Sequence, residues 1–221
     1  MSHHGLWEAH TGMGAFVIRP RDRAYDTILR GAHDAFCRDL DRLAAAAAAG
    51  KGRAAHVREG WENFKDLFGL HQELTGRVLG PRVERAVGDR RAERGVLAVL
   101  RADNDRIGPL IGRVDTALED GRDLPSAVRE LRAALEAHLR HEATGVLPLA
   151  ESVLAAEEWE AFAVEAGRRC EARTPTFVPW VVDGIPPIER SRFLAALPAP
   201  LRDLNRVTWE PRYRKRRLWS G

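Results

Sequence analysis

Cysteine is scarce in this chain of 221 residues, which contains only Cys37 and Cys170. Two cysteines so far apart do not provide the disulfide framework of a small secreted domain, and they suit a reducing compartment. The sequence also lacks any apolar run of about 18 residues and any charged start followed by a short apolar stretch. It therefore predicts no transmembrane span, no signal peptide and a cytoplasmic location.

A strong excess of one charge is also missing. The formal net charge is +3, and the basic residues, mostly arginine, are mixed with acidic residues along most of the chain. This pattern is typical of solvated helix faces and argues against a nucleic-acid-binding surface. The exception is residues 209–219, where five cations lie among aromatic side chains: Trp209, Arg212, Tyr213, Arg214, Lys215, Arg216, Arg217 and Trp219. Such a tail can stack on bases, but we favour one whose arginines pack on the bundle or on a partner subunit.

The composition, with 44% hydrophobic and 30% charged residues, suits one well-buried domain with an appendage. Residues 1–20 show no helical period and contain His3, His4 and His10. These histidines could chelate a metal, but we favour a polar chain terminus. The pattern divides the chain into an N-terminal arm (1–20), a helical bundle (21–155) and a C-terminal extension (156–221).

Within the predicted bundle, four stretches carry apolar side chains at alternating spacings of three and four, the period of one helix face. They cover residues 22–49, 53–79 and 90–119 and the stretch that begins at Asp123. The loops between them are short and contain glycine or aspartate. The sequence therefore predicts an all-α fold built on an antiparallel up-down-up-down four-helix bundle.

Polar residues interrupt each apolar stripe near its middle: His33, His71 with Thr75, Asn104, and His138 with Glu142. Counting from the loops at about 1.5 Å per residue places all of them at one height in the bundle, within about a turn. A buried carboxylate such as Glu142 needs a cation or strong donors beside it. The group is therefore either a metal site or a metal-free hydrogen-bonded polar core.

This arrangement resembles that of hemerythrin-like proteins with an HHE cation-binding domain. The resemblance covers about residues 22–155 and rests on one motif per helix: a lone His, His-x-x-x-Glu, a second lone His, and another His-x-x-x-Glu. The matching segments are GAHDAFCRDLDRL, His71-Gln72-Glu73-Leu74-Thr75, RADNDRIGPLI, and His138-Leu139-Arg140-His141-Glu142 followed by Pro148. The resemblance implies a site in the bundle core at which members of this family hold two bridged irons.

Two of the family's ligand positions are changed in this chain. Thr75 stands where the resemblance implies a bridging glutamate, and Asn104 where it implies a histidine. Because both losses fall mainly on one iron, the resemblance implies a single Fe(II) at His33, His71 and Glu142, with His138 nearby as a fourth metal-site residue. Manganese or zinc would also suit these ligands, and a site without metal is the alternative.

Small residues near the two changed positions predict a pocket beside the metal. Gly76 follows Thr75, whereas Gly108 and Pro109 lie one turn beyond Asn104, where the proline should kink the helix. A small molecule could bind in the resulting space; simple helix packing at the glycines is the alternative. The residues expected to surround the metal or contact a substrate are Gln72, Thr75, Asn104, His141 and Cys37. For Cys37, a buried structural thiol is the interpretation that we favour.

Beyond the bundle, residues 157–170 predict a fifth helix. Residues 174–188 contain four prolines and predict a linker or an extended segment laid over the bundle. Two further short helices are expected at 191–197 and 201–209.

Two functions fit the sequence. One is a non-haem iron protein for dioxygen, nitric oxide or redox chemistry, or an oxidase or oxygenase of a small substrate. The other is a metal-free binding or interaction module that uses the core pocket or the basic tail. The expected partner is a small molecule or a diatomic gas, without membrane or nucleic acid, and a homodimer is left open. No residue is assigned a catalytic role.

Overall fold

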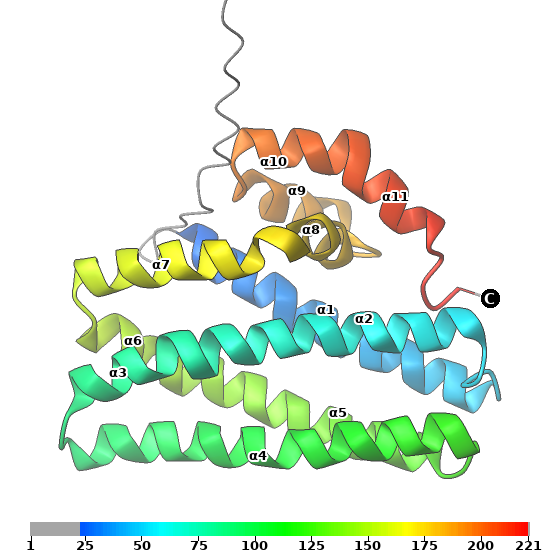
Figure 1. Ribbon diagram of the computed structural model, residues 1–221, viewed down its shortest axis with the longest axis horizontal. Helices are drawn as coiled ribbons and strands as arrows, with labels where there is room; N and C mark the ends of the chain where they lie inside the picture. Colours follow the sequence, from blue (N-terminus) through cyan, green and yellow to red (C-terminus); the bar gives the residue numbers. More distant parts are fainter. Residues whose placement is uncertain (1–22, 221) are drawn as a thin grey trace, which may run out of the picture.

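The computed structural model describes residues 23–220, in which every regular element is helical (Figure 1). This confirms the all-α class; the predicted arm, with His3, His4 and His10, lies outside the described residues. None of the described helices is long and apolar enough to cross a membrane. The elements are α1 (Arg23–Ala48), α2 (Ala55–Gln72), η1 (Glu73–Leu79), α3 (Gly80–Val87), α4 (Arg91–Asp120), α5 (Leu124–His141), η2 (Glu142–Val146), α6 (Leu147–Val153), α7 (Ala156–Cys170), η3 (Glu171–Arg173), α8 (Thr174–Val182), α9 (Pro187–Ala195), α10 (Ala199–Leu204), η4 (Asn205–Trp209) and α11 (Glu210–Lys215).

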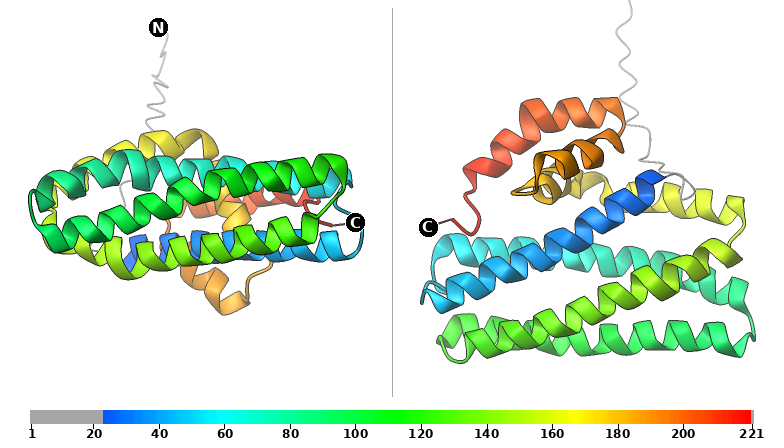
Figure 2. Two further views of the ribbon diagram at one scale, coloured as in Figure 1. Left: turned by 90° about the horizontal axis from the view of Figure 1, so that it is seen from below. Right: turned by 180° about the vertical axis from the view of Figure 1, so that it is seen from behind.

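Four helical rods make up the main body of the molecule. The first is α1, the second runs through α2, η1 and α3, the third is α4, and the fourth runs through α5, η2 and α6. They lie side by side, and successive rods are joined at alternate ends (Figures 1 and 2). The second rod continues past Gly80, whose main-chain N–H donates to the carbonyl of Thr75 across the π-helical η1, and Pro81 lies in the first turn of α3.

The second and fourth rods each contain a π-helical segment at the level of the predicted site. The segment η1 begins at Glu73, two residues after His71, and η2 begins at Glu142 itself. A π turn takes up an additional residue, so the side chains that follow it are rotated about the helix axis. Such turns are frequent at functional sites.

Buried polar side chains separate two apolar clusters of the core. One cluster, which includes Phe36, Phe64 and Leu135, fills the end of the bundle near the α1–α2 and α4–α5 connections. The other includes Val83 and Leu97 and fills the opposite end. The polar side chains buried at the intervening level are His71, Thr75, Asp103, His138 and Glu142. Polar groups buried in this way need partners of their own, which the two apolar clusters do not provide.

The C-terminal extension is helical throughout most of its length. The expectation of a linker or extended segment over residues 174–188 is wrong, because α8 occupies Thr174–Val182. Pro175 lies in the first turn of α8, where proline is tolerated, and Pro179 removes a single helical hydrogen bond. Complete burial of Trp180 against the bundle offsets that loss.

Specific polar contacts join α8 to α1. The carboxylate of the fully buried Asp39 accepts a hydrogen bond of 2.8 Å from Nε1 of Trp180. Arg38 donates to the main-chain carbonyls of Trp180 at 2.6 Å and Val181 at 3.1 Å, and Arg42 pairs with Asp183 at 2.8 Å. Burial raises the pKa of Asp39 to about 6. The extension is thus bound to the bundle by one buried hydrogen bond and several part-buried polar contacts, as well as by apolar contacts.

The end of the described chain lies along α2. Arg216 donates to the carboxylate of Glu59 and to Oδ1 of Asn63, each at 3.0 Å. The main-chain N–H of Trp219 donates to the carbonyl of His56 at 3.1 Å. The Trp219 ring covers Gly60 so closely that any Cβ there would overlap it. These contacts bind part of the basic and aromatic tail to the bundle itself.

Candidate metal centre

Three rods bring two imidazoles and one carboxylate together. His33 comes from α1, His71 from the last turn of α2, and Glu142 from the start of η2. The Nε2 atoms of His33 and His71 lie 3.1 Å and 3.0 Å from Oε2 of Glu142. One ligand atom from each residue lies within 4.8 Å of the other two. A single cation with ligand distances of about 2.0–2.2 Å can contact all three.

The polar atoms of this group fit a cation better than they fit one another. Despite the short distances, neither histidine contact has hydrogen-bond geometry. The Nε2 atoms of His33 and His71 and both oxygens of Glu142 are buried without a hydrogen-bond partner among the described residues. Buried polar groups are normally paired, so a converging set left without hydrogen bonds indicates a ligand. Two imidazole nitrogens and a carboxylate oxygen are suitable donors for a divalent transition metal.

The charge on Glu142 is maintained by its neighbours. The side chain is fully buried, and burial alone would favour the protonated form. The adjacent His71 and His33 overcome this effect and hold the pKa of the carboxyl group well below its usual range. The site therefore contains a permanent carboxylate in an apolar interior, where a metal ion would balance its charge.

His138 lies next to this group and is completely buried. Its ring centroid is 6.1 Å from that of His71, and neither of its ring nitrogens has a hydrogen-bond partner among residues 23–220. Burial lowers its pKa to about 4. At neutral pH the ring is therefore uncharged, which is the form that binds metals.

The low pKa of His138 predicts a pH-dependent stability of the metal-free protein. In the unfolded chain a histidine titrates near 6.5, so between about pH 6.5 and 4 the unfolded state binds a proton that the folded state does not. The free energy of unfolding should thus fall as the pH drops through this window, by about 3 kcal/mol from this group. Urea unfolding of metal-free protein and of the His138→Leu variant will measure the difference. Equal slopes in the two proteins would contradict the prediction.

The structure places Thr75 and Asn104 differently with respect to the core. Thr75 is buried in η1, and its hydroxyl donates to the main-chain carbonyl of His71 at 3.1 Å. Asn104 is only half-buried, and its Oδ1 accepts from Nε2 of Gln72 at 3.4 Å. The short Thr75 side chain leaves the His71 side of the site open, whereas Gln72 and Asn104 form a hydrogen bond of their own between α2 and α4.

A buried acid that the sequence pattern had not indicated lies on α4. Asp103, rather than Asn104, is the buried polar residue of that helix, and its Oδ2 lies 2.6 Å from Nδ1 of His141. The side chain of His141 is 43% exposed, so this pair connects the core to the surface. The spacing Leu100, Asp103, Ile107 fits a helical stripe as well as the spacing through Asn104 does, so it marks Asp103 as a candidate without separating the two residues.

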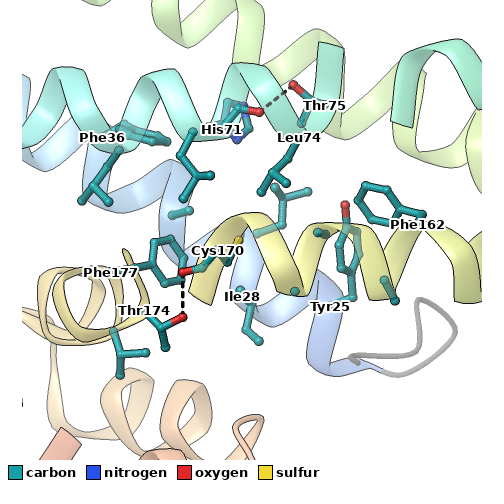
Figure 3. Close-up of a pocket in the computed structure, with 18 residues that line it drawn as sticks. Tyr25, Ile28, Phe36, His71, Leu74, Thr75, Phe162, Cys170, Thr174 and Phe177 are labelled. Carbon is teal, nitrogen blue, oxygen red and sulfur yellow. Dashed lines mark hydrogen bonds between the residues drawn. The ribbon is translucent and has the colours of Figure 1, made fainter. Parts of the chain in front are cut away.

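The expected pocket lies in a different place. Gly76 and Gly108 are both exposed, and α4 runs unbroken from Arg91 to Asp120 with Pro109 on its exposed side. Gly76, Gly108 and Pro109 therefore do not open the expected space beside the metal. A cavity does adjoin the site, but it lies between the bundle and α7, where His71 and Thr75 line it and Asn104 does not (Figure 3).

Cys37 lies half-buried on α1 and packs against the first apolar cluster. Burial, together with the charge of Glu136 on α5, raises the pKa of its thiol. The other cysteine, Cys170, lines the cavity.

Comparison with known families agrees with this geometry. The family model described as the hemerythrin HHE cation-binding domain matches residues 25–150, which is more than half of the chain. The chain belongs to the hemerythrin HHE cation-binding family. No curated protein and no solved structure matches it significantly. The hemerythrin match contains His33, His71, His138 and Glu142 and ends within α6, so α7 to α11 lie outside it.

Proposed function

We propose that this hemerythrin-family chain holds one iron ion between His33, His71 and Glu142 and uses it in dioxygen, nitric oxide or redox chemistry, or to oxidise a small substrate. The observation that carries the proposal is the convergence of three buried ligand atoms without hydrogen-bond partners among the described residues. Two histidines and one carboxylate are typical of mononuclear Fe(II) sites with open positions. Bound iron would supply one-electron and oxygen chemistry that side chains lack. The same ligands also suit manganese or zinc.

The residues around the triad support one metal rather than two. Thr75 offers a hydroxyl already used on the carbonyl of His71, and Asn104 is hydrogen-bonded to Gln72. Neither provides the carboxylate or imidazole that a second iron would need. His138 supplies an uncharged imidazole beside the triad, where it can serve as a further ligand or orient a bound molecule.

We also infer that residues 21–155 form an antiparallel up-down-up-down bundle and that residues 156–221 are an extension packed on it. The short connections between rods and the alternation of their ends support the first inference. The buried contacts of Trp180 with Arg38 and Asp39 support the second.

Titration of the metal-free protein with Fe(II) should saturate near one ion per chain. The protein must be produced without a polyhistidine tag, and bound iron is measured after removal of free metal. A saturation value of two, with the charge-transfer band of an oxo-bridged pair, would contradict the single-site proposal.

A metal-free binding module is the second candidate function, and the cavity beside His71 is the observation that favours it. Metal analysis of untagged protein as purified separates the two functions. Absence of metal together with failure to bind added Fe(II), Mn(II) or Zn(II) would support the second candidate.

A further inference from the structure

A cavity of about 120 Å³ lies between the hemerythrin bundle and the C-terminal extension. Its walls come from α1, from α2 with η1, and from α7 with α8, as the close-up in Figure 3 shows. His71 and Thr75 form the part of the wall that adjoins the candidate metal centre. The family match ends before α7, so the far wall is made by a part of the chain that the match does not cover.

The cavity wall is almost wholly apolar and carries no permanent charge. Leu74, Phe162 and Phe177 contribute aliphatic and aromatic surface. Two hydroxyls in the wall are used internally: Thr75 donates to the main-chain carbonyl of His71, and Thr174 donates to the main-chain carbonyl of Cys170. Burial raises the pKa of the Cys170 thiol to about 11, so this group stays protonated. In the part of the chain that the structure describes, no Asp, Glu, Lys or Arg lines the cavity, so a charged ligand would find no formal counter-charge in this wall.

Tyr25 brings a polar group into the cavity from α1. Its ring packs edge-on against Phe162, with ring centroids 6.0 Å apart, and its hydroxyl points towards the segment that carries Leu74 (Figure 3). Burial, followed by the charge of Glu142, raises the pKa of this hydroxyl, so it stays protonated. A protonated phenol can donate one hydrogen bond to an uncharged oxygen atom of a ligand.

Ion pairs hold the far wall in place. Arg82 of α3 pairs with Glu165 of α7 at 2.9 Å, and Arg169 of α7 pairs with Glu73 of η1. Arg173 pairs with Asp66 of α2 at 3.1 Å. These contacts join α7 and η3 to the second rod, so the cavity is a feature of the docked extension rather than of the bundle alone.

We propose that this cavity binds a small, uncharged, mainly apolar molecule of about the size of one six-membered ring, held by the extension beside His71. A cavity of about 150 Å³ lined by aliphatic and aromatic side chains is large enough for benzene, so the observed volume sets the scale of the ligand. The position beside the metal rests on the proposed function, whereas the binding of an apolar molecule does not. Within that function, the proposal identifies the substrate class as a small, neutral ring compound or a hydrocarbon of equal size.

The test uses fluorobenzene as the probe and fluorine NMR to measure its binding to the full chain without metal. Ala166 lines the cavity, so Ala166→Leu should weaken fluorobenzene binding about tenfold or more by filling the space, a loss of about 1.4 kcal/mol or more. Ala161→Leu, the same change on the exposed side of α7, is the matched control and should bind as the unaltered chain does. If Ala166→Leu fails to fold, Ala163→Val fills another part of the wall. Unchanged affinity in a folded, cavity-filled variant, or no binding by the unaltered chain, overturns the proposal.

A second measurement tests the position beside His71. Mn(II) at the candidate metal centre should broaden the fluorine signal of bound fluorobenzene. The broadening should disappear in the His33→Ala variant, because His33 is a proposed metal ligand that does not line the cavity. Bound fluorobenzene that shows no broadening in Mn(II)-loaded protein would overturn the location. If no metal binds but Ala166→Leu still weakens fluorobenzene binding, the iron proposal fails and the cavity assignment stands. If the metal binds but Ala166→Leu binds fluorobenzene as the unaltered chain does, the cavity assignment fails and the proposed metal centre stands.

Discussion

The His71→Ala variant should lose iron binding almost completely, whereas the His141→Ala variant should keep most of it. His71 contributes one of the three converging ligand atoms and is buried at the junction of α2 and η1. His141 lies one residue before Glu142 but has 43% of its side chain exposed and contacts Asp103 instead. Removing a direct ligand should weaken binding by about 100-fold or more, while a change outside the ligand set should cost about tenfold at most.

Iron per chain after titration with Fe(II) is the measurement for both variants. The two changes are chemically identical and fall on residues of the same type, so they control for the general effect of losing an imidazole. Circular dichroism and thermal unfolding will show whether each variant keeps its fold. A larger loss of iron in His141→Ala than in His71→Ala would mean that Asp103 and His141, rather than the triad, form the metal centre.

The common height at which polar side chains meet in the bundle core could be predicted from sequence. The rise per residue of a helix converts a count of residues from each loop into a distance along the bundle. His33, His71, His138 and Glu142 each interrupt an apolar stripe, and their distances from the loops place them together. The structure brings His33, His71 and Glu142 within reach of one cation and leaves His138 beside them. Local periodicity thus predicts the shared height of the four residues, whereas the choice of His33, His71 and Glu142 as the ligands of one metal was implied by the family resemblance.

Asp103 could not be separated from Asn104 in this way. Both residues fit a spacing of three and four between Leu100 and Ile107, so the pattern cannot say which of them faces the core. The choice depends on how α4 is rotated against its neighbours, and the contact of Asp103 with His141 shows the rotation that was adopted. Such a rotation is a property of packing rather than of one helix.

The cavity depends on contacts between distant parts of the chain, which periodicity does not reveal. Its walls require α7 and α8 to pack on α1, through contacts such as Trp180 with Asp39 across 141 residues of sequence. The prolines of residues 174–188 predicted an irregular segment, but the burial of Trp180 favours the helix instead. The pocket predicted near Gly108 followed from small side chains and an expected kink at Pro109, and it ignored the side of the helix on which these residues lie.

Thr75 lines the apolar cavity, and it also stands where the resemblance to the hemerythrin family implies a metal-bridging glutamate. A glutamate at this position would place a carboxylate in a buried wall, at a cost of several kcal/mol unless a cation accompanies it. A second metal and an apolar ligand should therefore compete for the space around residue 75. This competition offers a physical reason for the short side chain that the chain carries there.

The double variant Thr75→Glu with Asn104→His should bind two metal ions per chain, while each single variant should bind fewer. A carboxylate without the second imidazole leaves a second metal under-coordinated, and an imidazole without the carboxylate leaves excess positive charge, so the two changes should be non-additive. Thr75→Glu should also abolish fluorobenzene binding, because the longer side chain enters the cavity, whereas Asn104→His should not affect it, because Asn104 is not a lining residue. Iron per chain and fluorobenzene affinity, measured in the original chain and the three variants, test both statements. A folded double variant that stays at one metal while losing fluorobenzene would show that the surroundings of Thr75 serve the cavity and no longer support a second metal.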